Sequence, residues 1–284
     1  MTQCVIIRCK SVGSDEQTLY STLQTAFPDN DIYFSCDSDF ENTQRVLSLK
    51  RFIKQEGLDV EVPTLGWRCG DHNLYSVYNL NKDYDFYWLI EPDVFIQKQS
   101  LERLLEEASS THSDLLLHGL SKQTPSWSWY TRYQILYPEH TIFGGLFSLI
   151  RLSNSALSFL FDERKKLAKK WKSGSFEPAN YPNDEVFVCS MLMNNQFSCS
   201  ELQITQNGYF NLIRKHITNI PKDLIVHPIY SDYARIIEKE RFDLLATKKV
   251  GAGALATRIA KLLEQNNYDK VLLENLLDVV ITNN

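Results

Sequence analysis

The sequence predicts an α/β fold with a mixed, mostly parallel sheet flanked by helices. Strand-like and helix-like segments alternate over about the first 230 of the 284 residues, the pattern of βαβ units. The first strand, CVIIR (4–8), is short and β-branched, as expected for a strand buried on both faces. The segment DFYWLIEPDVFI (85–96) is the strongest strand pattern in the chain, and Pro92 breaks it between two acids. These observations together favour a Rossmann-like architecture.

Capping and breaking residues divide the chain into elements. Ser14 is a candidate N-cap with Gln17 at the third helical position, and Pro28 ends this first helix. A strand over 31–39 stops in an acidic cluster, and Gly57 closes a helix over 44–57. The remaining expected helices are 71–84, 100–110, 155–174 and 182–195, and the remaining expected strands are 114–120, 141–153 and 223–229.

From Tyr233 onward the chain has only helical patterns, so we expect an α/β domain over 1–232 and a helical extension over 233–284 packed on it. Apolar residues recur at helical spacing in this extension. The alternative is that these helices form a homodimer or a peripheral membrane contact. The apolar positions are Leu255, Ile259, Leu262, Leu263, Leu272, Leu273, Leu276 and Val279.

Composition limits the classes of partner and compartment. The net charge of −5 and the pI near 5.7 argue against duplex nucleic acid as the main partner. The six cysteines form no CxxC pair and lack zinc-finger spacing, so buried thiols in a reducing compartment are expected. The chain begins with no signal peptide and has no apolar run of about 20 residues. We therefore expect a cytoplasmic protein, with peripheral contact to the inner membrane left open.

Two carboxylates, Glu91 and Asp93, follow the strongest strand and are separated only by Pro92. In extended chain, residues i and i+2 point the same way, so both can face one cation at the carboxyl edge of the sheet. Mn²⁺ and Mg²⁺ favour such oxygen ligands. His227 ends a later strand and is a third candidate ligand. The alternatives are a polar turn at Pro92 and a structural histidine.

A second acidic pair, Asp184 and Glu185, opens the helix expected over 182–195. Acids in a first helical turn are stabilised by free backbone N–H groups, so an ordinary cap is one interpretation. The other is a general base that takes a proton from a hydroxyl group. We predict that Asp184, with the shorter side chain, caps the helix and that Glu185 is the base, with Asp184 as the fallback.

Further positions are expected to line a ligand at the carboxyl edge of the sheet. The segment WRCGDH (67–72) places Gly70 at a helix start, which suits an anion. Aromatic residues in TPSWSWYTRY (124–133) are candidates for stacking on a sugar ring or for core packing. The predicted ligand-binding residues besides Glu91 and Asp93 are Arg8, Asp37, Arg68, Asp71, Gly144 and Gly145.

In this order the motifs resemble the GT-A glycosyltransferases. The matching stretches are CVIIR, YFSCDSD, YWLIEPDVF, FGGLFSLIR, NDEVFV and IVHPI, over about residues 1–230. The acidic motif is DXD-like but begins with Glu. The segment around Glu185 is also similar to the S-P-D-E segment of core-2/I-branching N-acetylglucosaminyltransferases, whose Glu is the catalytic base and which work without a metal.

The resemblance implies transfer of a hexosyl or N-acetylhexosaminyl group from a nucleotide sugar, such as a UDP-sugar, to a glycan or lipid-linked glycan. An inverting mechanism assisted by Mn²⁺ or Mg²⁺ and a role in polysaccharide biosynthesis are the accompanying expectations. Two alternatives stay open, a sugar nucleotidyltransferase and a non-catalytic scaffold on the same fold. Gly-rich phosphate loops of the GxxxxGK[ST] or GxGxxG type are absent from the sequence.

Overall fold

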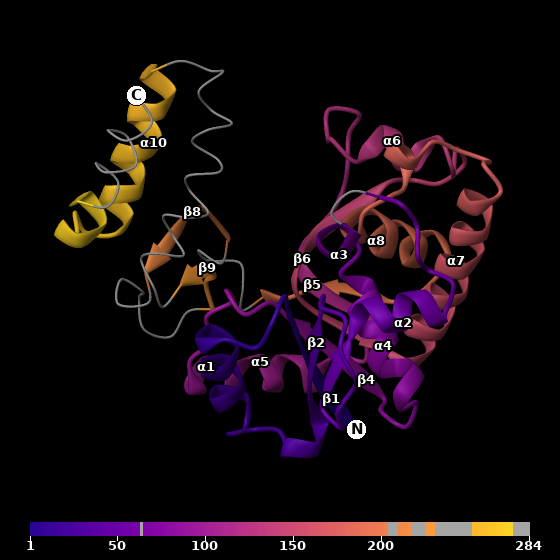
Figure 1. Cartoon of the computed structure of the whole chain (residues 1–284), viewed down its shortest axis with the longest axis horizontal. Helices are drawn as coiled ribbons and strands as arrows, with labels where there is room; N and C mark the ends of the chain where they lie inside the picture. Colours follow the sequence, from indigo (N-terminus) through magenta and orange to yellow (C-terminus); the bar gives the residue numbers. More distant parts are fainter. Residues whose placement is uncertain (63–64, 204–209, 217–224, 231–251, 275–284) are drawn as a thin grey trace. The chain divides into compact units, whose positions relative to one another are not determined.

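A computed structural model describes residues 1–62, 65–203, 210–216, 225–230 and 252–274 (Figure 1). The chain divides into two compact units. The first comprises residues 1–92 and 101–206, and the second comprises residues 93–100 and 207–284. This division near residue 206 differs from the boundary expected at 232, and the packing of the helical extension on the α/β domain stays a prediction.

Seven strands of the first unit form one sheet. Their order is β3-β2-β1-β4-β6-β5-β7, with β6 antiparallel to both its neighbours and all other pairs parallel. The sheet is therefore mixed and mostly parallel. The strands are β1 (Gln3–Cys9), β2 (Ile32–Cys36), β3 (Val46–Ser48), β4 (Phe86–Ile90), β5 (Leu115–Lys122), β6 (Phe143–Ser153) and β7 (Cys199–Glu201).

Helices connect these strands and cover the sheet. Two short 3₁₀ turns, η1 (Asp29–Asp31) and η2 (Pro178–Asn180), precede β2 and the last helix of this unit. The α-helices are α1 (Ser14–Leu23), α2 (Leu49–Gln55), α3 (Leu65–Arg68), α4 (Asp71–Leu80), α5 (Lys98–Ser110), α6 (Tyr130–Gln134), α7 (Asn154–Lys172) and α8 (Asp184–Asn194).

The two faces of the sheet are covered by different helices (Figure 1). On one face α2, α4, α7 and α8 pack over the main hydrophobic core, where the rings of Tyr75 and Phe161 stack at 5.2 Å between centroids. On the other face, the buried Arg151 of β6 donates a 2.6 Å bond to the Ala108 carbonyl of α5 and lies over the Phe86 ring. α1 contacts β1 on this second face. The predicted α/β fold class, with helices on both faces, is confirmed.

The strand order reverses direction between β1 and β4. From β1 the chain builds outward through β2 to β3, then returns to place β4 on the other side of β1. Open α/β sheets bind ligands outside the carboxyl ends of the strands at such a switch point. Arg8 is the second-last residue of β1, and Glu91 directly follows β4.

Some elements differ from the sequence-based expectations. The segment 44–57 contains the short strand β3 before α2, and the Ser48 hydroxyl caps α2 by accepting from the Arg51 N–H at 3.2 Å. The long strand expected over 85–96 ends at Ile90. α3, α6 and β7 were not expected, because three to five residues are too few to show a periodic pattern.

In the second unit, β8 (Phe210–His216) pairs in parallel with β9 (His227–Tyr230), and Phe95 forms an antiparallel bridge with Val226. α10 (Ala252–Gln265) is followed by a helical turn over 270–274. Leu262 and Leu272 are buried, whereas residues 233–251, Leu276 and Val279 lie outside the described residues. Within the described part of the chain, no helix is long and apolar enough to span a bilayer.

Candidate functional site

An ion pair joins the ends of β1 and β4 at the switch point of the sheet. Arg8 donates from Nη1 to Glu91 Oε1 at 2.6 Å. The Glu91 N–H is held by the Ser148 carbonyl of β6 at 2.9 Å. Two predicted ligand-binding residues, 83 positions apart in the sequence, are thus brought together because their strands are neighbours in the sheet.

The second amino group of Arg8 holds the segment before α4. Nη2 donates to the carbonyl oxygens of Gly66 at 2.5 Å and Trp67 at 2.8 Å. Asp37, just after β2, lies against the same segment, since a Cβ atom on Gly66 would come within 2.8 Å of its carboxylate oxygen. Burial raises the pKa of Asp37, while the Arg8 charge opposes the rise. The Arg8 guanidinium therefore organises the carboxyl edge around β1.

Asp184 completes this cluster from the first turn of α8. Its Oδ2 atom accepts from the Gly70 N–H at 2.7 Å and lies 3.8 Å from Arg8 Nη1. A Cβ atom at position 70 would lie 2.5 Å from Arg8 Nη1 and 2.7 Å from Asp184 Oδ2, so only glycine fits there. The Asp184 side chain is almost fully buried, and burial raises its pKa well above the usual value against the opposing charge of Arg8. Asp184 is a clamp between β1, the 66–70 segment and α8.

The helix cap is not Asp184, as predicted, but Asn183. The Asn183 side chain accepts from the Val186 N–H at 3.2 Å and donates to Glu185 Oε2 at 3.2 Å. Asp184 is itself the first residue of α8, where its carboxylate accepts from the Glu185 N–H at 2.8 Å and from the Gly70 N–H at 2.7 Å. Asn is as good an N-cap as Asp, and this signal was available in the sequence.

Glu185 keeps the properties expected of a general base. Burial raises its pKa to about 7, helped by the nearby Glu91 charge and opposed by the Asn183 hydrogen bond and Arg8. A base with a pKa near the working pH combines sufficient ionised fraction with sufficient proton affinity. The two adjacent acids of α8 therefore have different environments. Asp184 contacts Gly70 and Arg8, whereas the Glu185 carboxylate accepts from Asn183.

The positive charge of Arg8 lies among several carboxylates at the carboxyl ends of β1 and β4. Burial alone would lower the pKa of Arg8, but the carboxylates of Glu91, Asp184 and Asp37 raise it above its usual value. Arg8 is therefore a permanent positive charge at the edge of the sheet, and its surrounding acids keep it in place.

Asp71, predicted to bind the ligand, has a different environment. It is fully buried, and its carboxylate accepts from Arg164 Nε at 2.6 Å, Arg164 Nη2 at 3.2 Å and the Tyr75 hydroxyl at 2.9 Å. Both oxygens are engaged inside the core between α4 and α7. We therefore assign Asp71 to the structure of the domain and leave it out of the site proposed below.

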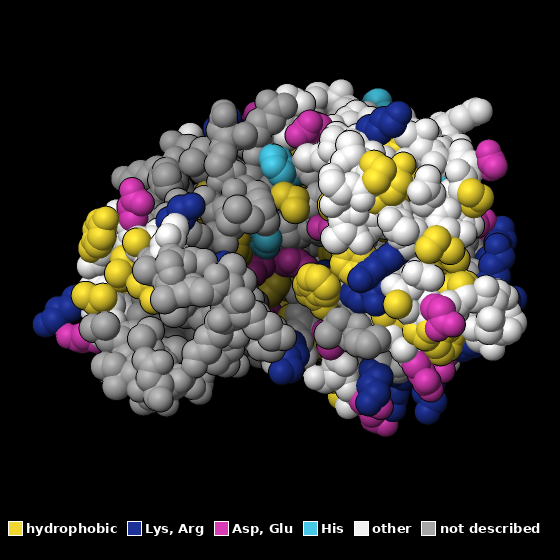
Figure 2. Space-filling view, turned by 90° about the horizontal axis from the view of Figure 1, so that it is seen from above, with side chains coloured by type: hydrophobic (Ala, Val, Ile, Leu, Met, Phe, Trp, Pro, Cys, Tyr) yellow, Lys and Arg dark blue, Asp and Glu magenta, His cyan; other side chains and the backbone are white. Residues whose placement is uncertain are grey.

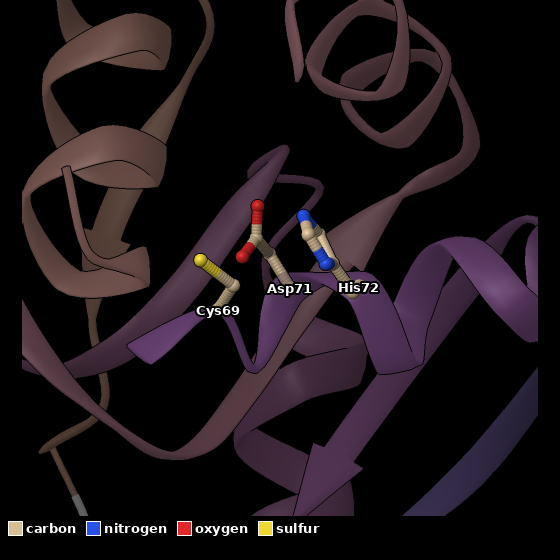
Figure 3. Close-up of side chains that lie close together, drawn as sticks. All are labelled: Cys69, Asp71 and His72. Atoms are coloured by element: carbon tan, nitrogen blue, oxygen red, sulfur yellow. The ribbon is translucent and has the colours of Figure 1, made fainter. Parts of the chain in front are cut away.

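Cys69, Asp71 and His72 also offer three ligand atoms within 4.8 Å of one another (Figure 3). All three are buried, and burial lowers the pKa of His72 to about 4 and raises that of Cys69 to about 12. A cation between them would face the Arg164 guanidinium, which is bonded to the same Asp71 carboxylate. Because both Asp71 oxygens already accept hydrogen bonds from Arg164 and Tyr75 inside the core, we do not assign a metal to the cluster.

The glycine pair of β6 makes room for protein side chains. A Cβ atom on Gly144 would lie 2.4 Å from the Trp127 ring, and one on Gly145 would lie 2.5 Å from Leu117 Cδ1. Both glycines thus face protein side chains, and the ligand contact predicted for Gly144 and Gly145 stays a prediction. Tyr133, in the aromatic segment 124–133, is fully buried, and its hydroxyl group lies 2.8 Å from His140 Nδ1.

In the second unit, Asp93 and His227 lie together. His227 Nε2 is 3.5 Å from Asp93 Oδ1, and the Ile229 N–H donates to the Asp93 carbonyl at 2.8 Å. A divalent ion held about 2.1 Å from each ligand atom spans up to about 4.2 Å between them, so the carboxylate–imidazole pair fits one. Glu91 belongs to the first unit, only two residues from Asp93 along the chain. The predicted convergence of all three ligands stays a prediction.

The sequence matches no known protein family, and no curated protein resembles it detectably in sequence. Among similar solved structures is mannose-1-phosphate geranyltransferase from Thermus thermophilus, 8% identical over 76% of this chain and 84% of that chain, with a TM-score of 0.39. Mouse xyloside xylosyltransferase 1 is 9% identical over 76% and 88%, with a TM-score of 0.41. Glucosyl-3-phosphoglycerate synthase from Mycobacterium tuberculosis is 10% identical over 70% and 70%, with a TM-score of 0.34.

Proposed function

We propose that this chain is a glycosyltransferase that moves a sugar from a nucleotide-sugar donor, a UDP-sugar, to a hydroxyl group of a glycan or lipid-linked glycan. The observation that carries the proposal is Glu185. Its pKa is raised to about 7, and it follows the clamp residue Asp184 beside the Arg8–Glu91 pair at the switch point of the sheet.

The carboxyl ends of β1 and β4 are where we place the nucleotide. This is the ligand crevice of open α/β sheets. Asp37, after β2, has a carboxylate that can accept hydrogen bonds from ribose hydroxyl groups, as acids near a switch point do in nucleotide sites. The order of the acidic motif, the helix-opening acid and the late histidine, as in the GT-A glycosyltransferases, supports the same assignment.

A divalent ion is the expected cofactor, with Asp93, His227 and Glu91 as its ligands. Asp93 and His227 have a separation that fits one ion, and Pro92 alone separates Glu91 from Asp93. The carboxylate-rich set suits Mn²⁺ or Mg²⁺. When bound, the ion would offset negative charge on the diphosphate of the leaving nucleotide. Arg8 orients Glu91 through its 2.6 Å ion pair.

In the proposed reaction Glu185 takes the proton of the acceptor hydroxyl group. The acceptor oxygen forms a bond to the anomeric carbon of the donor sugar as the bond between that carbon and the diphosphate oxygen breaks. The electron pair leaves with the nucleoside diphosphate, and the proton stays on Glu185. Attack from the side opposite to the leaving group inverts the anomeric configuration.

Calorimetry with UDP and Mn²⁺ tests the donor site. The full chain is expected to bind UDP more tightly with Mn²⁺ than without it, and Asp93→Asn is expected to remove the Mn²⁺-dependent part while thermal unfolding is unchanged. The exposed Asp83→Asn is the matched control. A chain that binds neither UDP nor Mn²⁺ would be a scaffold. Formation of a nucleotide sugar and pyrophosphate from UTP and a sugar 1-phosphate would identify a nucleotidyltransferase.

A further inference from the structure

Arg68, the last residue of α3, is a buried cation. Only 7% of the residue is exposed, and the guanidinium donates from Nη2 to the Tyr181 carbonyl. Its Nε atom is buried and has no hydrogen-bond partner in the part of the chain that the structure describes. Among the described residues, no carboxylate lies within ion-pair distance of this guanidinium. Burial lowers the pKa of Arg68, the charges of Arg132 and Arg164 lower it further, and Cys69 and Asp184 oppose the shift.

An aromatic ring partly compensates for the burial of the Arg68 charge. The Arg68 guanidinium lies 5.1 Å from the centre of the Trp129 ring, and the Arg132 guanidinium lies 4.6 Å from it. Two like charges therefore share one indole, an attraction that is modest for each cation. Trp67 lies 6.4 Å from Trp129 between centroids and is 65% exposed. We call Trp67, Arg68, Trp129 and Arg132 the tryptophan–arginine cluster.

Backbone bonds attach this cluster to the proposed active site. The Trp67 carbonyl accepts from Arg8 Nη2, and the Gly70 N–H donates to Asp184 Oδ2. The segment that carries Trp67 and Arg68 is thus held by Arg8 of β1 and by Asp184, the residue that precedes the proposed base Glu185. On the face drawn in Figure 2, Lys or Arg side chains lie beside hydrophobic ones in the right-hand part of the picture.

We propose that the tryptophan–arginine cluster is a binding subsite for a sugar ring that carries an anionic substituent, a carboxylate or a phosphate. The exposed indole of Trp67 offers an apolar face to the ring, and the two guanidinium groups offer charge-assisted hydrogen bonds to the anion. The bound anion supplies a counter-charge to Arg68. The assignment of this sugar to the acceptor, next to the base, rests on the proposed function.

Ligand-detected NMR titration of the full chain tests the subsite with three defined probes. These are methyl β-D-glucuronide, D-glucose 6-phosphate and the neutral methyl β-D-glucoside. We expect at least one charged sugar to bind about tenfold more tightly than the neutral glucoside at low salt, the gain of one hydrogen bond to a charged group. The comparison of the glucuronide with the phosphate identifies the anion.

Three variants locate the effect. Arg68→Gln and Arg132→Gln are each expected to remove most of the preference for the charged sugar, and Arg132→Gln does so without touching the bond to Tyr181. Trp67→Ala is expected to weaken charged and neutral sugars alike, because the exposed ring contacts the sugar itself. The exposed Arg103→Gln of α5 is the matched control and should bind as the unchanged chain does.

Equal binding of the three sugars, or no binding of any, would overturn the subsite. Persistence of the preference in folded Arg68→Gln and Arg132→Gln would overturn it as well. The donor experiment fails independently: if the chain selects charged sugars but binds no UDP, the glycosyltransferase proposal is wrong and the subsite stands. If UDP binds and the sugars are not distinguished, only the subsite is wrong.

Discussion

Two ion pairs of the first unit invite comparison because both join residues far apart in the sequence and both lie near the 66–71 segment. Asp71 and Arg164 are completely buried, and every oxygen of the carboxylate has a protein donor. Arg8 and Glu91 lie at the edge of the sheet, where the Glu91 side chain is 24% exposed. The buried Asp71–Arg164 pair therefore stabilises the fold, whereas the partly exposed Arg8–Glu91 pair is accessible to a ligand.

This difference in solvent exposure determines how much free energy of unfolding is lost when one partner of each pair is removed. Removing one partner of a fully buried pair leaves an uncompensated charge in the core. At the sheet edge, by contrast, water or a ligand can replace a lost partner. The first pair should therefore control stability and the second should control binding and reaction. The predictions below test this contrast.

The largest expected effect is on turnover in Glu185→Gln. Loss of a general base typically lowers the rate by about 10²–10⁴-fold. We expect that reduction in sugar transfer, measured by nucleotide release with donor and acceptor present, while UDP affinity is nearly unchanged.

Asp184→Asn serves as the neighbouring control. Because Asp184 bonds to Gly70 and lies near Arg8, we expect this variant to lose thermal stability first. Full activity in Glu185→Gln with slow transfer in a stable Asp184→Asn would exchange the two roles.

Asp71→Asn is expected to lower the free energy of unfolding by about 3–5 kcal/mol, because Arg164 then keeps its charge in the core without its counter-ion. Urea unfolding followed by circular dichroism measures this change. The exposed pair Lys172–Asp59 gives the control, since Asp59→Asn should cost less than about 1 kcal/mol. Equal losses in both variants would contradict the contrast between buried and exposed pairs.

The pH dependence of transfer should follow Glu185. A base acts in its ionised form, so the rate should rise with pH and level off above about 7, the pKa that burial produces. Below that pH the rate should fall about tenfold for each pH unit. A rate profile that is flat between pH 5 and pH 8, on our expectation of one titrating base, would exclude Glu185 from this role.

Asn183→Ala should have the smallest effect. Loss of the cap on α8 is expected to lower stability by about 1 kcal/mol. The lost hydrogen bond to Glu185 Oε2 should also move the rise in activity to slightly higher pH, because that bond lowers the pKa of Glu185. Asn183→Ser keeps an oxygen for the cap but loses the amide donor, so it should retain most of the stability and still shift the profile. A shift seen in neither variant would mean that the bond does not tune the base.

Local patterns predicted most of the elements of the first unit. β1, β4 and β6 are apolar runs, and α7 and α8 begin beside capping residues, so short-range preferences suffice to find them. β3 and β7 have three residues each and are stabilised only by pairing with a neighbouring strand. Such pairing has no signature within the segment itself.

The sequence by itself determined the α/β alternation, the two acids at the end of the strongest strand pattern and the acidic start of α8, because each depends on residues close together in the chain. Only the tertiary structure decided which partner each of the acids Asp71 and Asp184 contacts. Asp71 meets Arg164 across 93 positions, and Asp184 meets Gly70 across 114. Partners at such distances are brought together by strand order and helix packing, and their burial then sets whether a charge stabilises the fold or remains available for chemistry.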